Sequence, residues 1–256
     1  MQPTGNEKNK ALLAVDQLVK RYDGRAVVDR LSFHVNRGEI VGLLGRNGAG
    51  KTTSFRMTVG MIDPDEGSVF FDGQIVTSMP MYKRAQLGMG YLSQEPSVFG
   101  RLCVRDNLLA ILETMRGMNR KERLEKADRL IEQFHLTEQR DQLARTLSGG
   151  ERRKLEIARA LVTEPKLIML DEPFSGVDPK AVEELQEEIL HLKRDLGIAI
   201  LLTDHNVRET LRVTDRSYII NEGHKLAEGT PREIVRDPLV RSTYLGSSFR
   251  GDEFDQ

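Results

Sequence analysis

The sequence is poor in the residues that would cross-link the chain or embed it in a membrane. Its 256 residues include one cysteine, Cys103, and no tryptophan. A single cysteine excludes an intramolecular disulfide and suits a reducing compartment. The apolar runs, such as residues 198–202, are far shorter than the roughly 20 residues that a membrane-spanning helix needs. We therefore expect a cytoplasmic chain with no signal peptide and no membrane span of its own.

A strong charge of either sign is also lacking. The 38 lysines and arginines nearly balance the 39 aspartates and glutamates, which leaves a formal net charge of -1. Such a chain has no global field that favours nucleic acid or anionic lipid, so no nucleic-acid partner is expected. Charged residues at 30% and hydrophobic residues at 39% are typical of a globular protein.

Hydrophobic patterning divides the chain into an α/β core and an inserted helical region. Helical periodicity dominates from about residue 100 to 165, whereas strand-like stretches lie on both sides of it. Two of these stretches, residues 167–172 and 198–203, are apolar throughout, which indicates strands of a parallel sheet covered on both faces. The other strand-like stretches are residues 11–22, 26–35, 39–45, 67–76 and 89–94.

These patterns predict an α/β fold with a mainly parallel core sheet, an antiparallel β subdomain and an inserted helical subdomain. The expected domain covers residues 11–245, and the helical subdomain covers about 100–165 within it. Residues 1–10 are polar and are expected to be disordered, and residues 246–256 would form a carboxyl-terminal tail.

Residues 45–52, GRNGAGKT, match the pattern G-x-x-x-x-G-K-[ST] of a phosphate-binding loop. An apolar strand precedes the loop and a helix-like segment follows it, which disfavours the alternative of a plain glycine-rich turn. Backbone N–H groups would converge on phosphate oxygens, Lys51 would reach the β- and γ-phosphates, and the Thr52 hydroxyl would ligate Mg²⁺. The candidate binding residues are Arg46, Asn47, Gly48, Ala49, Gly50, Lys51, Thr52 and Thr53.

Asp171 and Glu172 end the apolar strand LIMLDE. Unpaired carboxylates at a buried strand end are costly, and a bound Mg²⁺ would give Asp171 a reason to be there. Glu172 could polarise a water in line with the γ-phosphate. The structural alternative, a strand end followed by a helix cap, loses weight beside a phosphate loop.

Ser148 begins a helix and Glu151 follows three residues later, which predicts a capping box. Gly149 and Gly150 lie in the first turn of that helix, where each glycine costs about 1 kcal/mol relative to alanine. The cap does not require them, so the two glycines point to a second anion site at the amino terminus of the helix.

Two further strand ends carry polar candidates. Gln94 ends MGYLSQ, and its amide can accept from water while it ligates a metal. His205 ends ILLTDH and precedes a predicted capping box from Asn206 to Glu209. Taken alone, Gln94 would be a solvated loop residue and His205 a structural histidine. Only their positions relative to the other motifs favour a functional role.

The ordered series of these motifs resembles the nucleotide-binding subunits of ABC transporters over nearly the whole chain. It consists of the phosphate loop, LSGGE at 147–151, LIMLDEP at 167–173, SGVD at 175–178 and TDH at 203–205. The resemblance implies ATP and Mg²⁺ as cofactors, with Thr52, Gln94 and Asp171 at the metal. It also implies that Glu172 is the general base and that His205 contacts the γ-phosphate, and Gln94 counts with these two as a catalytic residue.

The same resemblance implies a homodimer with two ATP molecules at its interface. The residues Ser148, Gly149, Gly150 and Glu151 would then meet the other subunit's ATP, and Asp178 would lie at the interface. Tyr22 matches the aromatic residue that stacks on adenine in this family, although a half-buried strand tyrosine is the structural alternative.

By resemblance, residues 95–102 help to line a groove for a short helix of a membrane subunit at the cytoplasmic face of the inner membrane. The contact candidates are Phe99, Arg101 and Leu102, and the alternative is a hydrophobic plug beneath the helical insert. The stretches 172–179, 204–211 and 240–251 are most similar to ATPases of lipopolysaccharide export. ATPases of branched-chain amino-acid importers share parts of this pattern.

Three classes of function are open to a chain with these motifs. A transporter ATPase needs an intact set of catalytic residues, and this chain has one, including Glu172. An ABC-type ATPase of DNA repair or translation usually has two cassettes or a long coiled-coil insert, for which this chain has no room. A non-catalytic regulator should lack Glu172 or His205, and both are present. The sequence therefore favours the transporter ATPase.

Overall fold

The computed structural model describes residues 11–95, 97–115, 117–176 and 178–246, together with Phe249, Gly251 and Phe254. The expected disorder of residues 1–10 and most of the expected tail therefore lie outside the described residues. In the described part of the chain, no helix is long and apolar enough to cross a membrane.

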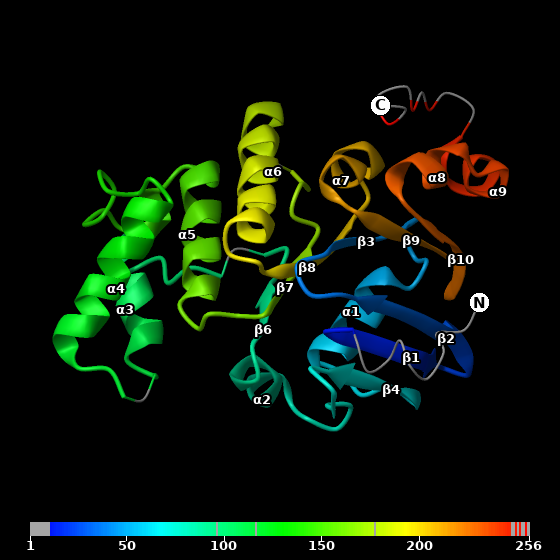
Figure 1. Ribbon diagram of the computed structural model, residues 1–256, viewed down its shortest axis with the longest axis horizontal. Helices are drawn as coiled ribbons and strands as arrows, with labels where there is room; N and C mark the ends of the chain where they lie inside the picture. Colours follow the sequence, from blue (N-terminus) through cyan, green and yellow to red (C-terminus); the bar gives the residue numbers. More distant parts are fainter. Residues whose placement is uncertain are drawn as a thin grey trace.

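A six-stranded sheet forms the centre of the molecule, in the order β10-β9-β3-β8-β7-β6 (Figure 1). Neighbouring strands are parallel except for β10, which is antiparallel to β9. The strands are β3 (Ile40–Gly45), β6 (Met89–Leu92), β7 (Leu167–Asp171), β8 (Ala199–Asp204), β9 (Arg216–Asn221) and β10 (His224–Gly229). The β9–β10 hairpin was not among the strands expected from the sequence.

The second sheet is antiparallel, in the order β2-β1-β4-β5. It contains β1 (Leu13–Tyr22), β2 (Arg25–Val35), β4 (Glu66–Phe71) and β5 (Gln74–Ile75). The stretch expected as one strand at 67–76 is a hairpin, because Asp72 and Gly73 both take positive φ angles of 49° and 77°. Such a pair forms the tight turn that matches strand twist. The helix α1 (Lys51–Val59) contacts strands of both sheets.

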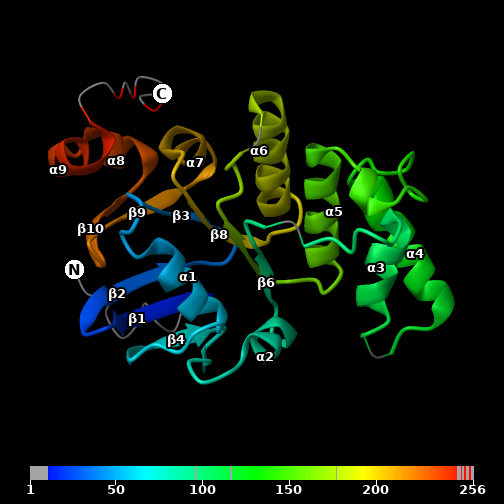
Figure 2. The same ribbon diagram turned by 180° about the vertical axis from the view of Figure 1, so that it is seen from behind.

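The helical insert follows β6 and lies at the end of the molecule away from β1 and β2 (Figures 1 and 2). It contains α3 (Val104–Leu112), α4 (Arg120–Gln133) and α5 (Gly149–Leu161). The other helices are α2 (Met81–Gln86), α6 (Pro179–Arg194), α7 (Val207–Val213), α8 (Pro231–Arg236) and α9 (Pro238–Val240). The predicted fold class, with its antiparallel subdomain and helical insert, is confirmed.

Both faces of the central sheet are buried, as the apolar runs predicted. Ile200 and Leu202 on β8 pack into the cluster that contains residues of α5 and α6. Ala199 and Leu201 on the same strand pack on the other side, with residues of α1 and the antiparallel sheet. Because parallel strands place their carboxyl ends at one edge, the segments after β3, β7 and β8 lie close together there. This edge carries the candidate site.

Candidate nucleotide site

The phosphate loop joins β3 to α1 and has a backbone that glycine permits. Gly48 and Gly50 take φ angles of 81° and 101°, and a Cβ at Gly50 would lie 2.6 Å from the Val27 carbonyl oxygen. The Lys51 ammonium donates to the carbonyls of Gly45 at 2.6 Å and Arg46 at 3.1 Å. Burial lowers the pKa of Lys51, which neighbouring carboxylates partly offset. The loop is therefore folded around its lysine.

A contact that the sequence did not reveal fastens this loop to the β9–β10 turn. The Gly223 N–H donates to the Ala49 carbonyl at 3.0 Å, and the Gly223 carbonyl accepts from Asp29 N–H at 3.0 Å. Gly223 has a φ of 82°, and a Cβ there would lie 2.8 Å from the Val27 carbonyl oxygen. Its signal was the glycine in the two-residue break between two short strands, because glycine readily takes the positive φ that a tight hairpin turn needs.

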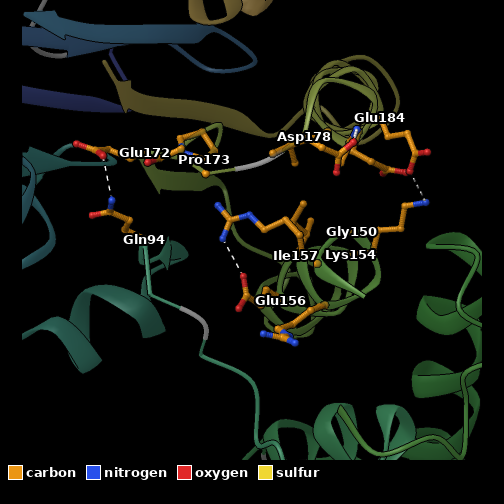
Figure 3. Close-up of a pocket in the computed structure, with 17 residues that line it drawn as sticks. Gln94, Gly150, Lys154, Glu156, Ile157, Glu172, Pro173, Asp178 and Glu184 are labelled. Atoms are coloured by element: carbon orange, nitrogen blue, oxygen red, sulfur yellow. Dashed lines mark hydrogen bonds and ion pairs between the residues drawn. The ribbon is translucent and has the colours of Figure 1, made fainter. Parts of the chain in front are cut away.

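The structure brings most of the predicted phosphate and catalytic residues to one pocket. Its lining consists of Val27, Asn47, Gly48, Gly50, Lys51, Thr52, Thr53, Gln94, Glu172 and His205. The Gln94 amide donates to Glu172 Oε2 at 3.0 Å (Figure 3). His205 Nδ1 lies 3.6 Å from the same oxygen. The catalytic candidates thus converge on one carboxylate oxygen beside the phosphate loop.

Asp171 has the environment of a cation ligand. Its side chain is buried, Tyr91 donates to Oδ2 at 3.3 Å, and Oδ1 has no hydrogen-bond partner among the described residues. Burial raises the pKa of Asp171. A buried carboxylate oxygen without a partner is costly, and a metal ion would relieve that cost. Thr52 and Gln94 line the adjoining pocket.

The described residues contain no cluster of three or more His, Cys, Asp or Glu side chains that could hold a metal by themselves. One carboxylate beside a hydroxyl and an amide oxygen fits Mg²⁺, which is usually held by one or two carboxylates together with waters and substrate phosphates. The assignment of Thr52, Gln94 and Asp171 as metal residues stays a prediction.

Asp204 positions two segments of the site, a role that the sequence did not predict. It is fully buried and accepts from the N–H groups of Phe174 at 2.9 Å and Asn206 at 2.8 Å. It thereby ties the segment after Glu172 to the segment around His205. The expected capping box at Asn206 is wrong, because the Asn206 side chain makes no cap hydrogen bond.

The capping box at α5 is confirmed, with Ser148 Oγ accepting from Glu151 N–H and Glu151 accepting from Ser148 N–H. Gly149 and Gly150 line a second pocket together with Gln94 and Glu172 (Figure 3). A Cβ at either glycine would meet nothing within 4 Å. Neither backbone conformation nor packing among the described residues requires these glycines.

The remaining candidates have local structural roles in the described chain. Asp178 caps α6 by accepting from Ala181 N–H at 3.1 Å, and it lines the second pocket. Tyr22 ends β1 with 47% exposure, and the Lys20 ammonium lies 5.8 Å from its ring centroid. Their proposed contacts with nucleotide or with a second subunit stay predictions.

A phosphate loop after the buried strand β3, with an acidic pair at the same edge of the sheet after β7, defines a phosphate-loop nucleotide hydrolase. The ABC transporter family model matches residues 28–175. The chain belongs to the ABC transporter family of ATP-binding subunits, and its activity is ATP hydrolysis. A second model, the branched-chain amino acid ATP-binding cassette transporter, matches residues 224–250.

Individual relatives narrow this class. The chain is 51% identical to the lipopolysaccharide export system ATP-binding protein LptB of Escherichia coli K12, over 94% of this chain and 99% of the relative. It is 50% identical to the protein of the same name from Haemophilus influenzae, with the same coverage of both chains.

Solved structures agree with the fold. An ATP-binding cassette of an ABC transporter in its ADP conformation superposes with a TM-score of 0.82 at 30% identity, covering 93% of this chain and 99% of the other. The cbiO1 subunit of a Clostridium perfringens ABC transporter complex gives a TM-score of 0.83 at 26% identity, covering 96% and 100%.

Proposed function

We propose that this chain is the ATPase subunit of a lipopolysaccharide exporter. The observation that carries the proposal is its 51% identity, over 94% of its length, to an ATP-binding protein of lipopolysaccharide export. The chain would act at the cytoplasmic face of the inner membrane, on membrane subunits that provide the path for the lipid. ATP binding would close the subunits together, and hydrolysis would release them.

The site supports the chemistry of this proposal. Lys51 would bind the β- and γ-phosphates, and Mg²⁺ near Thr52, Gln94 and Asp171 would neutralise phosphate charge when bound. Glu172 would accept a proton from the attacking water, because its Oε2 lies at the pocket with Gln94 at 3.0 Å and His205 at 3.6 Å. His205 would contact the γ-phosphate from the end of β8, the strand between β3 and β7.

A homodimer with two ATP molecules between its subunits is the proposed working state. Gly149 and Gly150 support it, because no described neighbour lies where their side chains would be. Bare N–H groups at the amino terminus of α5 form an anion site that another molecule can approach closely. The second subunit's γ-phosphate is the proposed anion, and Tyr22 would stack on adenine.

The proposed docking site for the membrane subunits is centred on Phe99, Arg101 and Leu102. Phe99 is 44% exposed, which is high for a phenylalanine, and Arg101 is exposed beside it. Leu102 is half-buried. An exposed aromatic next to a cation is typical of a binding surface.

A branched-chain amino-acid importer is the second candidate. The observation that favours it is the match of residues 224–250 to the model of that transporter class. This match covers a short carboxyl-terminal stretch, whereas the lipopolysaccharide export relatives align over 94% of the chain.

The experiment that separates the candidates is an affinity purification of tagged Glu172→Gln protein from its own membranes with Mg-ATP, followed by mass spectrometry. Recovery of two related membrane subunits together with lipopolysaccharide would support export. Recovery of amino-acid permease subunits would reject export in favour of import. A Phe99→Ala version of the same bait should lose most of the membrane subunits if docking lies there, and Glu125→Ala on α4 serves as the control.

A further inference from the structure

The loop that carries Phe99, residues 97–102, is hydrogen-bonded to the helical insert on three sides. From α5, Glu156 Oε1 accepts from the Ser97 N–H at 2.9 Å, and the Arg159 guanidinium donates to the Ser97 carbonyl at 2.5 Å. The Arg159 guanidinium also lies 4.5 Å from the Phe99 ring centroid. Glu156 and Arg159 of α5 thus hold the backbone N–H and carbonyl of Ser97, and the Arg159 guanidinium also contacts the Phe99 ring.

The fully buried Asn107 of α3 likewise binds both backbone polar groups of Phe99. Its Oδ1 accepts from the Phe99 N–H at 2.8 Å, and its amide donates to the Phe99 carbonyl at 3.1 Å. A third attachment is formed by backbone groups, since Gly100 accepts from Arg145 N–H at 3.1 Å and Leu102 from Ala144 N–H at 2.9 Å. The chain continues from there directly to the start of α5.

The core side of this segment is attached elsewhere. Gln94 donates to Glu172 at 3.0 Å, so residue 94 belongs to the nucleotide pocket. Three residues later, the backbone N–H and carbonyl of Ser97 are hydrogen-bonded to side chains of α5. Gln94 is therefore attached to the catalytic core, whereas Ser97 and the Phe99 that follows it are attached to the helical insert.

The burial of the Glu156 carboxylate costs free energy, which packing alone would not explain. Its side chain is 5% exposed, and its second oxygen accepts from Arg153 at 2.8 Å. A buried ion pair rarely stabilises a fold more than apolar residues of similar size would. The Glu156 carboxylate is explained instead by the backbone N–H that it holds in the loop.

We propose that Asn107, Glu156 and Arg159 are positioning residues that join the Phe99 loop to α5 as one rigid unit. A push on Phe99 would then move residues 148–150 at the amino terminus of α5, where the second anion site lies. This proposal rests on the proposed docking at Phe99. It adds the residues through which a membrane subunit would control closure over ATP.

The test uses Asn107→Ala and Glu156→Ala, with Glu156→Gln as the conservative variant and Glu125→Ala as the matched control. Glu125 lies on the same insert, is 55% exposed and pairs only loosely with Lys121 at 3.8 Å. Hydrogen exchange of residues 97–102 in the isolated chain tests the attachment alone. We expect about tenfold faster exchange in both alanine variants, as the loss of a hydrogen bond to a charged or buried group would give.

The second measurement is ATPase activity with Mg-ATP, in the isolated chain and in the complex with its membrane subunits in proteoliposomes. We expect the isolated activity to stay within about twofold, and the activity of the complex to fall by about tenfold. Glu156→Gln should recover most of it, because a neutral amide still accepts from Ser97. Equal losses in both settings would overturn the proposal in favour of a merely structural role.

Faster exchange without loss in the complex would also overturn it, because the attachment would then transmit nothing. The docking proposal fails separately, if Phe99→Ala leaves the membrane subunits bound. If an alanine variant does not fold, Arg159→Met decides the same question, because it removes the donor to the Ser97 carbonyl and keeps a long side chain at that position. We expect the same faster exchange of residues 97–102 and the same loss of activity confined to the complex.

Discussion

Glu172 is the side chain on which the proposed reaction depends. Glutamine in its place keeps the length and can still accept from Gln94, which donates to Oε2 at 3.0 Å in the native chain. It cannot take a proton from water. We expect Glu172→Gln to retain ATP affinity within about threefold and to lose at least about 100-fold in turnover, the scale of general-base catalysis. Equilibrium nucleotide binding and steady-state ATPase assays check this, and near-normal turnover would exclude Glu172 as the base.

We expect the buried Asp171 carboxylate to lower the free energy of unfolding while it serves the proposed metal site. Its pKa is raised by burial, so the folded state binds a proton more readily than the unfolded state does. The free energy of unfolding therefore falls as pH rises through the ordinary aspartate range, and the cost persists at neutral pH. We expect Asp171→Asn to raise Tm at neutral pH by about 2–4 °C for each kcal/mol relieved. The gain should shrink as pH falls through the raised pKa of the native carboxyl, because the native side chain is then neutral as well.

The same Asp171→Asn variant should lose at least about tenfold in Mg²⁺-dependent ATPase activity, because the metal loses a charged partner. Differential scanning fluorimetry across pH and ATPase assays at several Mg²⁺ concentrations measure the two effects. A lower Tm at neutral pH would mean that Asp171 is stabilised by a partner other than the metal.

At the scale of the element, α5 gives opposite expectations for folding and assembly. A side chain at Gly149 meets nothing within 4 Å, and glycine is a poor helix former. We therefore expect Gly149→Leu to raise the free energy of unfolding of the monomer by about 0.5–1 kcal/mol. The same side chain should block close approach of an anion to the helix and weaken ATP-dependent dimerisation by at least about tenfold.

Chemical denaturation and analytical ultracentrifugation with Mg-ATP test this pair of effects, preferably in the Glu172→Gln background. Glu132→Ala, an exposed position on α4, is the control for a helix-stabilising change far from the proposed interface. Unchanged dimerisation in Gly149→Leu would refute the second anion site.

At the scale of the whole molecule, ligand and metal should decide the oligomeric state. We expect Glu172→Gln protein with Mg-ATP to form a dimer, because each nucleotide would contact residues 45–52 of one subunit and 148–150 of the other. Its Tm should then rise with protein concentration, as coupled assembly requires. Removal of Mg²⁺ with EDTA should return it to the monomer. Light scattering with and without EDTA makes the comparison. A dimer that persists without ATP and without Mg²⁺ would contradict the proposed cycle.

The contiguous motifs were readable in the sequence because each is a local unit. The phosphate loop needs its glycines and lysine within residues 45–52, and the capping box needs Ser148 and Glu151 three positions apart. Runs that are apolar throughout predicted strands buried on both faces, and β7 and β8 are such strands. The sequence alone thus determined the fold class and the family, and it named most residues that line the pocket beside the phosphate loop.

Only the tertiary structure decided which distant groups hold that pocket together. Gly223 fastens the phosphate loop and belongs to none of the motifs in the sequence. Asp204 lies within the TDH motif, but that motif does not show that Asp204 joins the segments of Glu172 and His205. Ser97 and Glu156 are 59 residues apart, and Tyr91 and Asp171 are 80 apart. Such pairs have no fixed spacing, because parallel strands and packed helices bring chain segments together through long connections. Their contacts follow from packing, which no local pattern records.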